Sequence, residues 1–256
     1  MPLRIGFDLD GVLADMEAEL VRQAEAIFGK AMTRRLVADR AARADELPAG
    51  AAEAGDSDST GQPAADRPPE DTPPLLKLQM SSRQQRRLWH HVETITNFWE
   101  TLEELEPGMI QRIAAMAADR RWEIIFLTKR PESAGATAQV QTQRWLESKG
   151  FRLPSVFVVR GSRGRIASAL GLDVVVDDRP ENCLDVVVDS KAHAILVWRD
   201  DEKLLPVAAK RLGIGVVKTV GECLDVLARM NAPVTDQPGV VGRMMRLLGR
   251  KETAPV

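Results

Sequence analysis

The chain of 256 residues contains no tyrosine, 4% aromatic residues, two cysteines and three histidines. The two cysteines, Cys183 and Cys223, cannot build a disulfide framework and lack the spacing of metal ligands, so we expect both to be reduced thiols in the core. His90 and His91 are adjacent and would diverge on a helix, so they do not form a ligand pair. These shortages argue against a disulfide scaffold and against a cysteine- or histidine-based metal site.

Net charge and long apolar runs are also scarce. The formal net charge is −2, which creates no global field that would attract a nucleic acid polymer or a membrane. No apolar run approaches the roughly 20 residues that a membrane span needs. The N-terminus enters an acidic strand directly, without the charged and apolar regions of a signal peptide. We therefore expect a cytoplasmic protein without a membrane span.

The most informative stretch is 4–15, close to the N-terminus. Ile5, Phe7 and Leu9 form a short apolar run that is typical of a buried strand. The run ends at Asp8 and Asp10, whose side chains would point the same way on an extended strand. Two such carboxylates repel each other unless a cation or a shared proton lies between them. The stretch therefore predicts a site for a cation or for proton transfer.

Further apolar stretches with strand character follow along the chain at 123–128, 156–159, 173–176, 194–198 and 215–220. Helical patterns separate them, so the sequence predicts an α/β fold whose mostly parallel sheet is covered on both faces. Residues 184–188 repeat the apolar pattern of 172–176. Because a crossover must precede the strand at 194–198, we expect this second copy to be helical.

The segment 16–105 separates the first two strands and predicts a helical insertion. Its helices are expected after Asp15, at 31–47 and, as one helix or a pair, at 82–105. The part at about 48–74 is rich in proline, alanine and acidic residues, and we expect it to be disordered. The core would then comprise 1–15 and 106–230.

The remaining segment, 231–256, predicts a C-terminal tail with a basic amphipathic helix at 239–250. We expect this helix to pack on the core or on a second subunit, which allows a homodimer, with contact to a membrane surface as the alternative. Trp89, Phe98 and Trp99 lie at helical spacing, and a core position is favoured over base stacking.

Polar residues gather at the predicted ends of three strands. Asp8 and Asp10 follow the first, Thr128 and Lys129 the second, and Asp177 and Asp178 end the strand at 173–176. In a parallel sheet, ligands collect outside the carboxyl ends of the strands, so these side chains should share one site. Oxygen ligands of this kind favour Mg²⁺, which also binds phosphate.

The same residues carry a family resemblance. The stretch Asp8-Leu9-Asp10-Gly11-Val12-Leu13-Ala14-Asp15 resembles the first motif of the haloacid dehalogenase (HAD) superfamily, and Val-Val-Val-Asp177-Asp178-Arg-Pro its fourth. Together with Asn97-Phe98-Trp99, these motifs are most similar to the 5'(3')-deoxyribonucleotidase group. The resemblance implies a Rossmann-like, HAD-like fold with a helical cap at 16–105, inserted after the first strand.

The resemblance also implies roles for individual residues. Asp8 would be the nucleophile that forms an aspartyl-phosphate, and Asp10 the general acid and base. Thr128 would donate to a phosphoryl oxygen. Mg²⁺ would be bound by Asp8, the Asp10 carbonyl and Asp178, with Asp177 as a more distant or alternative ligand.

The third motif departs from the family, because no lysine lies between Gly150 and Asp178. Arg163, Arg165 and Lys129 are the candidate replacements, and Arg163 is favoured because it lies first in a loop that glycines at 161 and 164 would make flexible. Arginine is planar and forked, so it is not a neutral substitute for lysine. We expect Thr128, Lys129 and Arg163 to bind substrate.

These features together predict a Mg²⁺-dependent phosphomonoester hydrolase. Its substrate would be a small phosphorylated molecule, with a nucleoside 5'-monophosphate the leading candidate. Two alternatives stay open: a phosphate- or nucleotide-binding protein without turnover, and an interaction protein that uses the acidic segment and the basic tail for docking.

Overall fold

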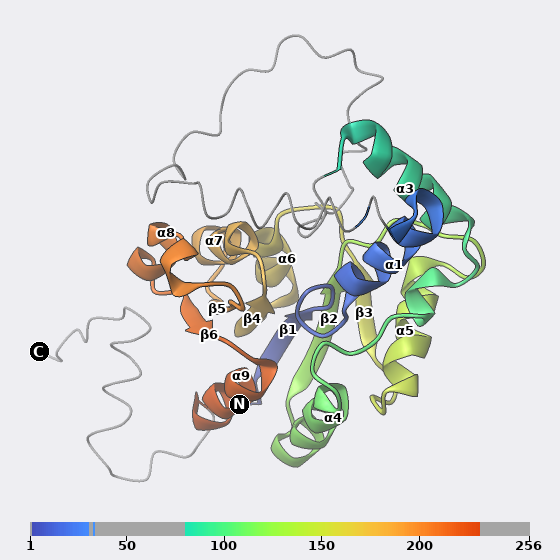
Figure 1. The fold of residues 1–256 in the computed structure, drawn as a ribbon. Helices are drawn as coiled ribbons and strands as arrows, with labels where there is room; N and C mark the ends of the chain where they lie inside the picture. The colour runs from blue at the N-terminus through green and yellow to red at the C-terminus, as the bar shows by residue number, and fades with distance from the viewer. Residues whose placement is uncertain (1, 31–32, 34–79, 231–256) are drawn as a thin grey trace, which may run out of the picture.

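The computed structural model describes residues 2–30, 33 and 80–230. The helix expected at 31–47, the segment at about 48–74 and the amphipathic helix at 239–250 therefore lie outside the described residues. Within the described part, six parallel strands form one sheet in the order β3-β2-β1-β4-β5-β6 (Figure 1). The strands are β1 (Arg4–Asp8), β2 (Glu123–Thr128), β3 (Ser155–Val158), β4 (Val174–Asp177), β5 (His193–Val197) and β6 (Gly215–Val217). The predicted α/β class is confirmed.

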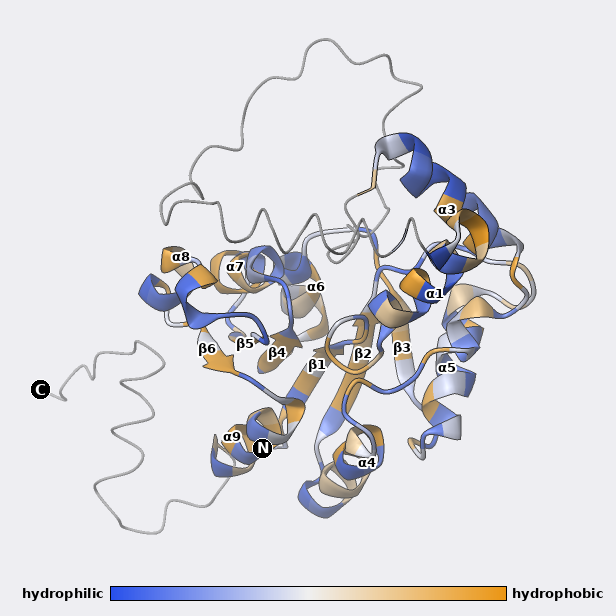
Figure 2. Ribbon diagram, viewed as in Figure 1, coloured by the Kyte–Doolittle hydropathy of each residue, from blue (hydrophilic) through white to orange (hydrophobic). Residues whose placement is uncertain are grey.

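Helices cover both faces of this sheet, as Figure 1 shows. Residues of α4 (Met109–Arg120), α5 (Ala138–Ser148) and α9 (Val220–Met230) pack into one core cluster, and residues of α6 (Arg163–Leu170), α7 (Pro180–Asp189) and α8 (Val207–Arg211) into the other. Alternation lets β2, β4 and β5 supply both clusters: in β2, Ile124 and Phe126 belong to the first, and Ile125 and Leu127 to the second. Figure 2 shows the resulting pattern, with apolar strands between helices that turn polar sides outward.

Two helices of the segment 16–105 lie beside the carboxyl edge of the sheet. They are α1 (Met16–Phe28) and α3 (Ser82–Thr94), which pack against each other (Figure 1). Asp15 caps α1, because its carboxylate accepts from the Ala18 amide at 2.9 Å. The stretch 82–105 is thus not one helix: α3 ends at Thr94, and a short 3₁₀ helix, η2 (Phe98–Glu100), follows.

Two local expectations concern the repeat at 184–188 and the last strand. The second copy of the repeat lies in α7 and is helical, as expected. The strand expected at 215–220 ends at Val217, because Val220 already begins α9. A second short 3₁₀ helix, η3 (Glu202–Leu204), lies between β5 and α8. No helix in the described ranges has the length and apolarity required to cross a bilayer.

The aromatic and thiol groups lie in the core, as predicted from the sequence. Trp89, Phe98 and Trp99 are buried, so the core interpretation of these side chains is confirmed. Cys183 and Cys223 are free and buried. Their thiols pack in separate core clusters, one on each face of the sheet.

Candidate functional site

A cavity of about 640 Å³ opens at the carboxyl edge of the sheet. Its position matches the point where the strand order reverses, between β1 and β4, which is where open α/β sheets bind ligands. The lining includes side chains from the ends of four strands, from α1 and from the start of α6: Asp8, Asp10, Met16, Glu17, Leu20, Lys129, Arg163, Asp178, Arg179, Trp198 and Arg199. The topology thus brings most of the predicted site residues together.

A tight turn after β1 shapes the floor of the cavity. The Leu9 carbonyl accepts from the amides of Val12, Leu13 and Ala14 at 3.3, 2.8 and 2.8 Å. Gly11 has a φ of +89°, and a Cβ placed there would lie 2.0 Å from Asp178 Oδ2. Glycine is therefore required at this position both by the backbone conformation and by the close approach of Asp178.

Asp8 lies at the end of β1 and pairs with a buried cation. It is 6% exposed, and its Oδ1 accepts from Nη2 of Arg163. Burial raises the pKa of Asp8 well above its ordinary value; the charge of Arg163 opposes this shift, and the charges of Asp177, Asp178 and Asp10 add to it. Asp8 therefore lies in a site that needs positive charge to hold the carboxylate ionised.

Arg163 is the first residue of α6, and Ser162 caps this helix by accepting from the Arg165 amide at 3.4 Å. The Nε of Arg163 lies 3.4 Å from Asp177 Oδ2. One guanidinium therefore contacts both Asp8 at the end of β1 and Asp177 at the end of β4. Among the described residues, the buried Nη1 of Arg163 has no hydrogen-bond partner.

The expectation that Arg163 lies in a flexible loop is wrong, because Arg163 begins α6. A Cβ at Gly164 would lie 1.9 Å from the Asp185 carbonyl, so this glycine permits close packing of α6 on α7.

Asp177 and Asp178 are neighbours with different surroundings. Asp177 is fully buried and accepts from the Arg179 amide at 2.9 Å and from Asn182 Nδ2 at 3.0 Å. It is the last residue of β4, one residue beyond the predicted strand end, and does not line the cavity. Asp178 lines the cavity, and its buried Oδ1 has no partner among the described residues. Burial, together with the charge of Asp177, raises the pKa of Asp178 to about 7.

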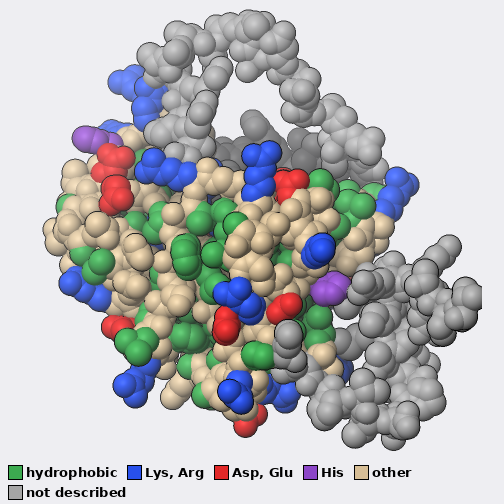
Figure 3. Space-filling model, turned by 180° about the vertical axis from the view of Figure 1, so that it is seen from behind, with side chains coloured by type: hydrophobic (Ala, Val, Ile, Leu, Met, Phe, Trp, Pro, Cys, Tyr) green, Lys and Arg blue, Asp and Glu red, His purple; other side chains and the backbone are tan. Residues whose placement is uncertain are grey.

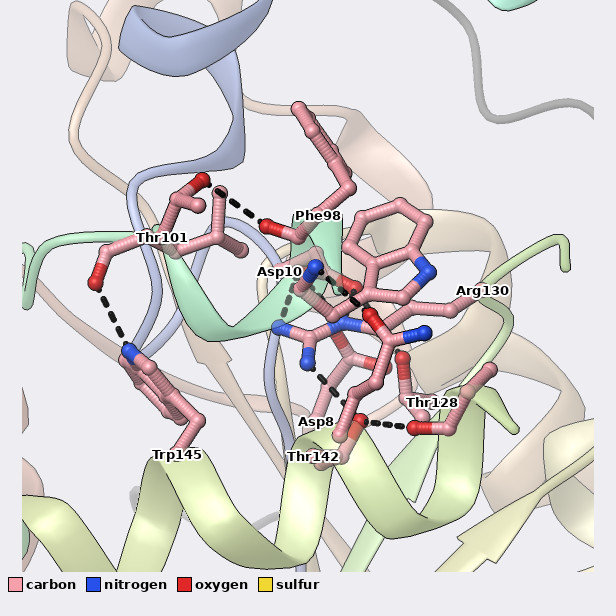
Figure 4. Close-up of polar contacts among 12 residues, drawn as sticks. Asp8, Asp10, Phe98, Thr101, Thr128, Arg130, Thr142 and Trp145 are labelled. Atoms are coloured by element: carbon pink, nitrogen blue, oxygen red, sulfur yellow. Dashed lines mark hydrogen bonds and ion pairs between the residues drawn. The ribbon is translucent and has the colours of Figure 1, made fainter. Parts of the chain in front are cut away.

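Asp10 is held by a second buried arginine, Arg130, as Figure 4 shows. The Nη2 of Arg130 donates to Asp10 Oδ1 at 2.7 Å, and its Nε lies 3.1 and 3.0 Å from the two carboxylate oxygens. The Thr128 hydroxyl donates to Asp10 Oδ2 at 3.0 Å. Thr128 is fully buried and does not line the cavity, so its hydroxyl is directed at Asp10 rather than at the space for a ligand.

The remaining cations lie nearer the surface. Lys129 lines the cavity, whereas the Arg165 side chain is 84% exposed and lies 3.9 Å from Asp189. The sequence interpretation missed Arg130, Arg179 and Arg199. Arg199 Nη1 donates to the Gly11 carbonyl at 2.6 Å and so braces the turn after β1. The sequence does indicate a cation at position 130, because Arg130 follows Thr128 by only two residues, next to Lys129.

Four carboxyl groups and two buried guanidinium groups meet at the strand ends, and three further cations, Lys129, Arg179 and Arg199, line the cavity nearer the surface. The carboxylates of Asp8, Asp10, Asp177 and Asp178 face the buried guanidinium groups of Arg130 and Arg163. A divalent cation would favour the ionised forms of Asp8 and Asp178, whose pKa values burial raises, and the unpartnered Asp178 Oδ1 offers it a ligand. In the described residues, no group of three or more His, Cys, Asp or Glu side chains is arranged to hold a metal ion. Asp8, Asp178 and a main-chain carbonyl would together form a ligand set with two carboxylates.

No protein-family model matches the chain, and no curated protein matches it. The solved structures that match include a hydrolase from Pseudomonas syringae, with 15% identity, a TM-score of 0.46 and coverage of 89% of this chain and 99% of that one. A putative beta-phosphoglucomutase from Thermotoga maritima has 17% identity, a TM-score of 0.47 and coverage of 89% and 99%. A HAD family hydrolase from Deinococcus radiodurans R1, solved with bound phosphate and sodium, has 15% identity, a TM-score of 0.48 and coverage of 90% and 96%.

Proposed function

We propose that the protein is a HAD-type phosphomonoester hydrolase that works through an aspartyl-phosphate. The observation that carries this proposal is the pairing of Asp8 with Arg163 at the floor of the cavity, since Arg163 keeps one buried guanidinium nitrogen without a partner. An anionic phosphoryl group beside Asp8 would supply that partner. A nucleophile next to a buried anion site is the arrangement that phosphoryl transfer requires.

In the proposed reaction, Asp8 attacks phosphorus and forms an acyl-phosphate bond. The bond from phosphorus to the leaving oxygen breaks, and Asp10 gives that oxygen a proton. Asp10 then takes a proton from water, which attacks the phosphorus of the intermediate, releases phosphate and restores Asp8. Both carboxylates line the same cavity, and a separate arginine holds each of them.

Arg163 takes the part of the third-motif lysine in this proposal. Its guanidinium bonds Asp8 and lies 3.4 Å from Asp177, which leaves Nη1 to donate to a phosphoryl oxygen. Asp177 then acts through Arg163: it accepts from Asn182 and from the Arg179 amide and so fixes the position of the cation. Asp177 is a poor choice for a direct metal ligand, because it does not line the cavity and already accepts from these groups.

Mg²⁺ belongs to the same proposal. Asp8, Asp178 and the Asp10 carbonyl are the groups that would hold it. When bound, it would neutralise charge on the carboxylates and on the phosphoryl oxygens. The raised pKa values of Asp8 and Asp178 are the reason to expect it, because a cation beside these groups would favour their ionised forms.

The substrate in this proposal is a small phosphomonoester, and a nucleoside 5'-monophosphate is the first candidate. A cavity of about 640 Å³ suits a molecule of that size. Met16, Glu17 and Leu20 of α1 line it, which supports a role for the segment 16–105 as a cap over the site. On the face seen in Figure 3, Lys and Arg are interspersed with Asp and Glu, a pattern that does not favour a nucleic acid polymer. Two free, buried thiols support a reducing compartment such as the cytoplasm.

Phosphate release tests the proposal. The purified chain is assayed with p-nitrophenyl phosphate and with a panel of nucleoside monophosphates and sugar phosphates, in Mg²⁺ and in EDTA. We expect turnover in Mg²⁺, loss of turnover in EDTA, and a phosphorylated enzyme that denaturation in acid preserves for mass spectrometry. Absence of phosphate release from every ester would contradict the proposal. A tenfold or greater preference for the sugar phosphates, about 1.4 kcal/mol in transition-state binding, would contradict the nucleotidase part alone.

One observation favours the binding-only alternative: Arg163 already engages Asp8, the proposed nucleophile. If this ion pair stays closed, phosphate would bind without turnover. Calorimetry with inorganic phosphate in Mg²⁺ separates the two functions, because a binding protein would show saturable heat in preparations that release no phosphate.

A further inference from the structure

A tryptophan lines the cavity at the end of β5 and has no part in the proposed reaction. Trp198 directly follows Val197, the last residue of β5, and its side chain is partly buried. The other tryptophans of the chain are at most 6% exposed and do not line the cavity: Trp89, Trp99, Trp122 and Trp145. The phenylalanines do not line it either. Among the aromatic side chains of the described residues, Trp198 is therefore the one that a ligand in this cavity can touch.

The register of the sheet separates Trp198 from the atoms that react. At the ends of the strands, Asp8 of β1 is level with Asp177 of β4, which pairs with Leu196 of β5. Trp198 therefore lies about 10 Å from Asp8 across the sheet and about 7 Å farther toward its carboxyl edge. A phosphoryl group is too small to span this separation. A phosphomonoester with its phosphorus at Asp8 would instead bring its leaving group toward Trp198.

The ring of Trp198 is held in place by the core. The Trp198 amide donates to the Val217 carbonyl of β6 at 2.8 Å, and its Nε1 donates to the Asp201 carbonyl at 3.0 Å. The side chain also packs against the core cluster that includes residues of α7 and α8. The indole has no polar atom besides Nε1, and this atom is already bonded. Trp198 therefore offers a ligand carbon surface and a π face, and no hydrogen bond.

The next residue, Arg199, connects this segment to the turn after β1. Its Nη1 donates to the Gly11 carbonyl at 2.6 Å. Its Nη2 donates to the Val12 carbonyl at 3.2 Å and to Glu106 Oε1 at 2.7 Å. These bonds fix the main chain beside Trp198 relative to the turn that forms the floor of the cavity. The position of the ring is therefore set by the fold and does not depend on a ligand.

We propose that Trp198 forms a subsite for the leaving group and selects phosphomonoesters whose leaving group carries a planar aromatic ring, such as a nucleobase. This inference rests on the proposed phosphatase function. An indole that is fixed before the ligand arrives is a preformed surface for stacking, and such stacking depends little on which base is bound. Val197 and Pro206 add apolar surface to the same cavity. A sugar gains less from these side chains, because it is strongly hydrated and has no π face.

Two substrates that differ by the base separate this role from a structural one. Adenosine 5'-monophosphate and ribose 5-phosphate share the phosphorylated sugar, and we expect the wild type to have the higher kcat/KM for the nucleotide. Trp198→Leu should lower kcat/KM for the nucleotide at least about fivefold more than for ribose 5-phosphate, which corresponds to about 1 kcal/mol. A merely structural role would lower both values equally. Trp198→Phe should keep most of the preference, because it keeps an aromatic face.

Tryptophan fluorescence keeps the test decisive if Trp198→Leu does not fold. Adenosine 5'-monophosphate should quench the emission of the wild type more than ribose 5-phosphate does. Trp198→Phe should remove this difference, because the other tryptophans do not line the cavity. Phe157→Leu is the matched control, since Phe157 is an aromatic residue of β3 that is 42% exposed and does not line the cavity. We expect this control to match the wild type in the kinetics and in the fluorescence.

Equal losses on the two substrates in folded Trp198→Leu, or no loss at all, would overturn the inference and leave the phosphatase proposal intact. A quenching difference that Trp198→Phe retains would do the same. A wild-type protein that releases no phosphate from any ester would overturn both. Circular dichroism and the melting temperature of each variant establish that it is folded before its kinetics are compared.

Discussion

Arg163 offers the sharpest test of the electrostatics of the site, because it can be compared with a second arginine on the same helix. Arg163→Ala removes a guanidinium that is 5% exposed and leaves Asp8 and Asp177 buried without it. Removing one partner of a buried ion pair costs about 3 to 5 kcal/mol. Arg165→Ala removes a side chain that is 84% exposed, and such a surface pair contributes about 1 kcal/mol or less. Both changes replace arginine by alanine in α6, so effects of helix propensity nearly cancel.

The loss should also depend on pH, with a sign that follows from the neighbours. Burial raises the pKa of Asp8 and of Asp177, and Arg163 lowers both, so its removal raises both further. A carboxyl whose pKa is raised by folding stabilises the protein at low pH, and this contribution disappears as the pH rises through the folded-state pKa. Arg163→Ala should therefore lose more stability at about pH 8 than at about pH 5.

Urea unfolding in EDTA, followed by tryptophan fluorescence, measures this difference at both pH values. We expect the free energy of unfolding of Arg163→Ala at about pH 8 to lie at least 2 kcal/mol below that of Arg165→Ala. Activity should follow the same order, with Arg163→Ala losing more phosphate release than Arg165→Ala or Lys129→Ala. Equal stability of the two arginine variants, or a loss that shrinks as the pH rises, would refute the proposed role of Arg163.

Three other predictions address the same edge of the sheet. Asp8→Asn should abolish phosphate release and leave the circular dichroism spectrum unchanged, because the amide is isosteric but too weak a nucleophile; near wild-type turnover would contradict the mechanism. Gly11→Ala should lower the melting temperature and the turnover, since the new Cβ would lie 2.0 Å from Asp178 Oδ2. Gly29→Ala is its control, because Gly29 has a similar φ of +84° but no heavy atom within 4 Å of the added Cβ, and equal losses in the two variants would exclude the steric reason. In EDTA, the melting temperature should fall between about pH 5 and pH 8, because burial raises the pKa of Asp178 to about 7 and the stability that its proton provides is lost through that range. Asp178→Asn should flatten this dependence, and an unchanged slope would assign it to other groups.

The sequence by itself determined the parallel sheet and the edge of that sheet at which the cavity opens. Alternation of apolar side chains identified the strands, and the parallel arrangement followed from the helices between them. Because the carboxyl ends of parallel strands meet at one edge, Asp8 and Asp178 could be placed in one site without a structure. Both line the cavity. Strand ends were the least certain feature, since Asp177 was placed just beyond a strand of which it is the last residue.

Tertiary structure decided which charged groups are paired. Arg130 meets Asp10 across a sequence separation of 120 residues, and Arg163 meets Asp8 across 155. Local sequence carries little information about such pairs, because the first depends on β1 and β2 being neighbours in the sheet and the second on where the first turn of α6 lies. The distinction between Asp177 and Asp178 has the same origin: one carboxylate meets Asn182 and Arg163, while its neighbour faces the cavity. The close packing of Gly164 on α7, which holds the first turn of α6 in place, was likewise set by a contact between helices that sequence patterns do not encode.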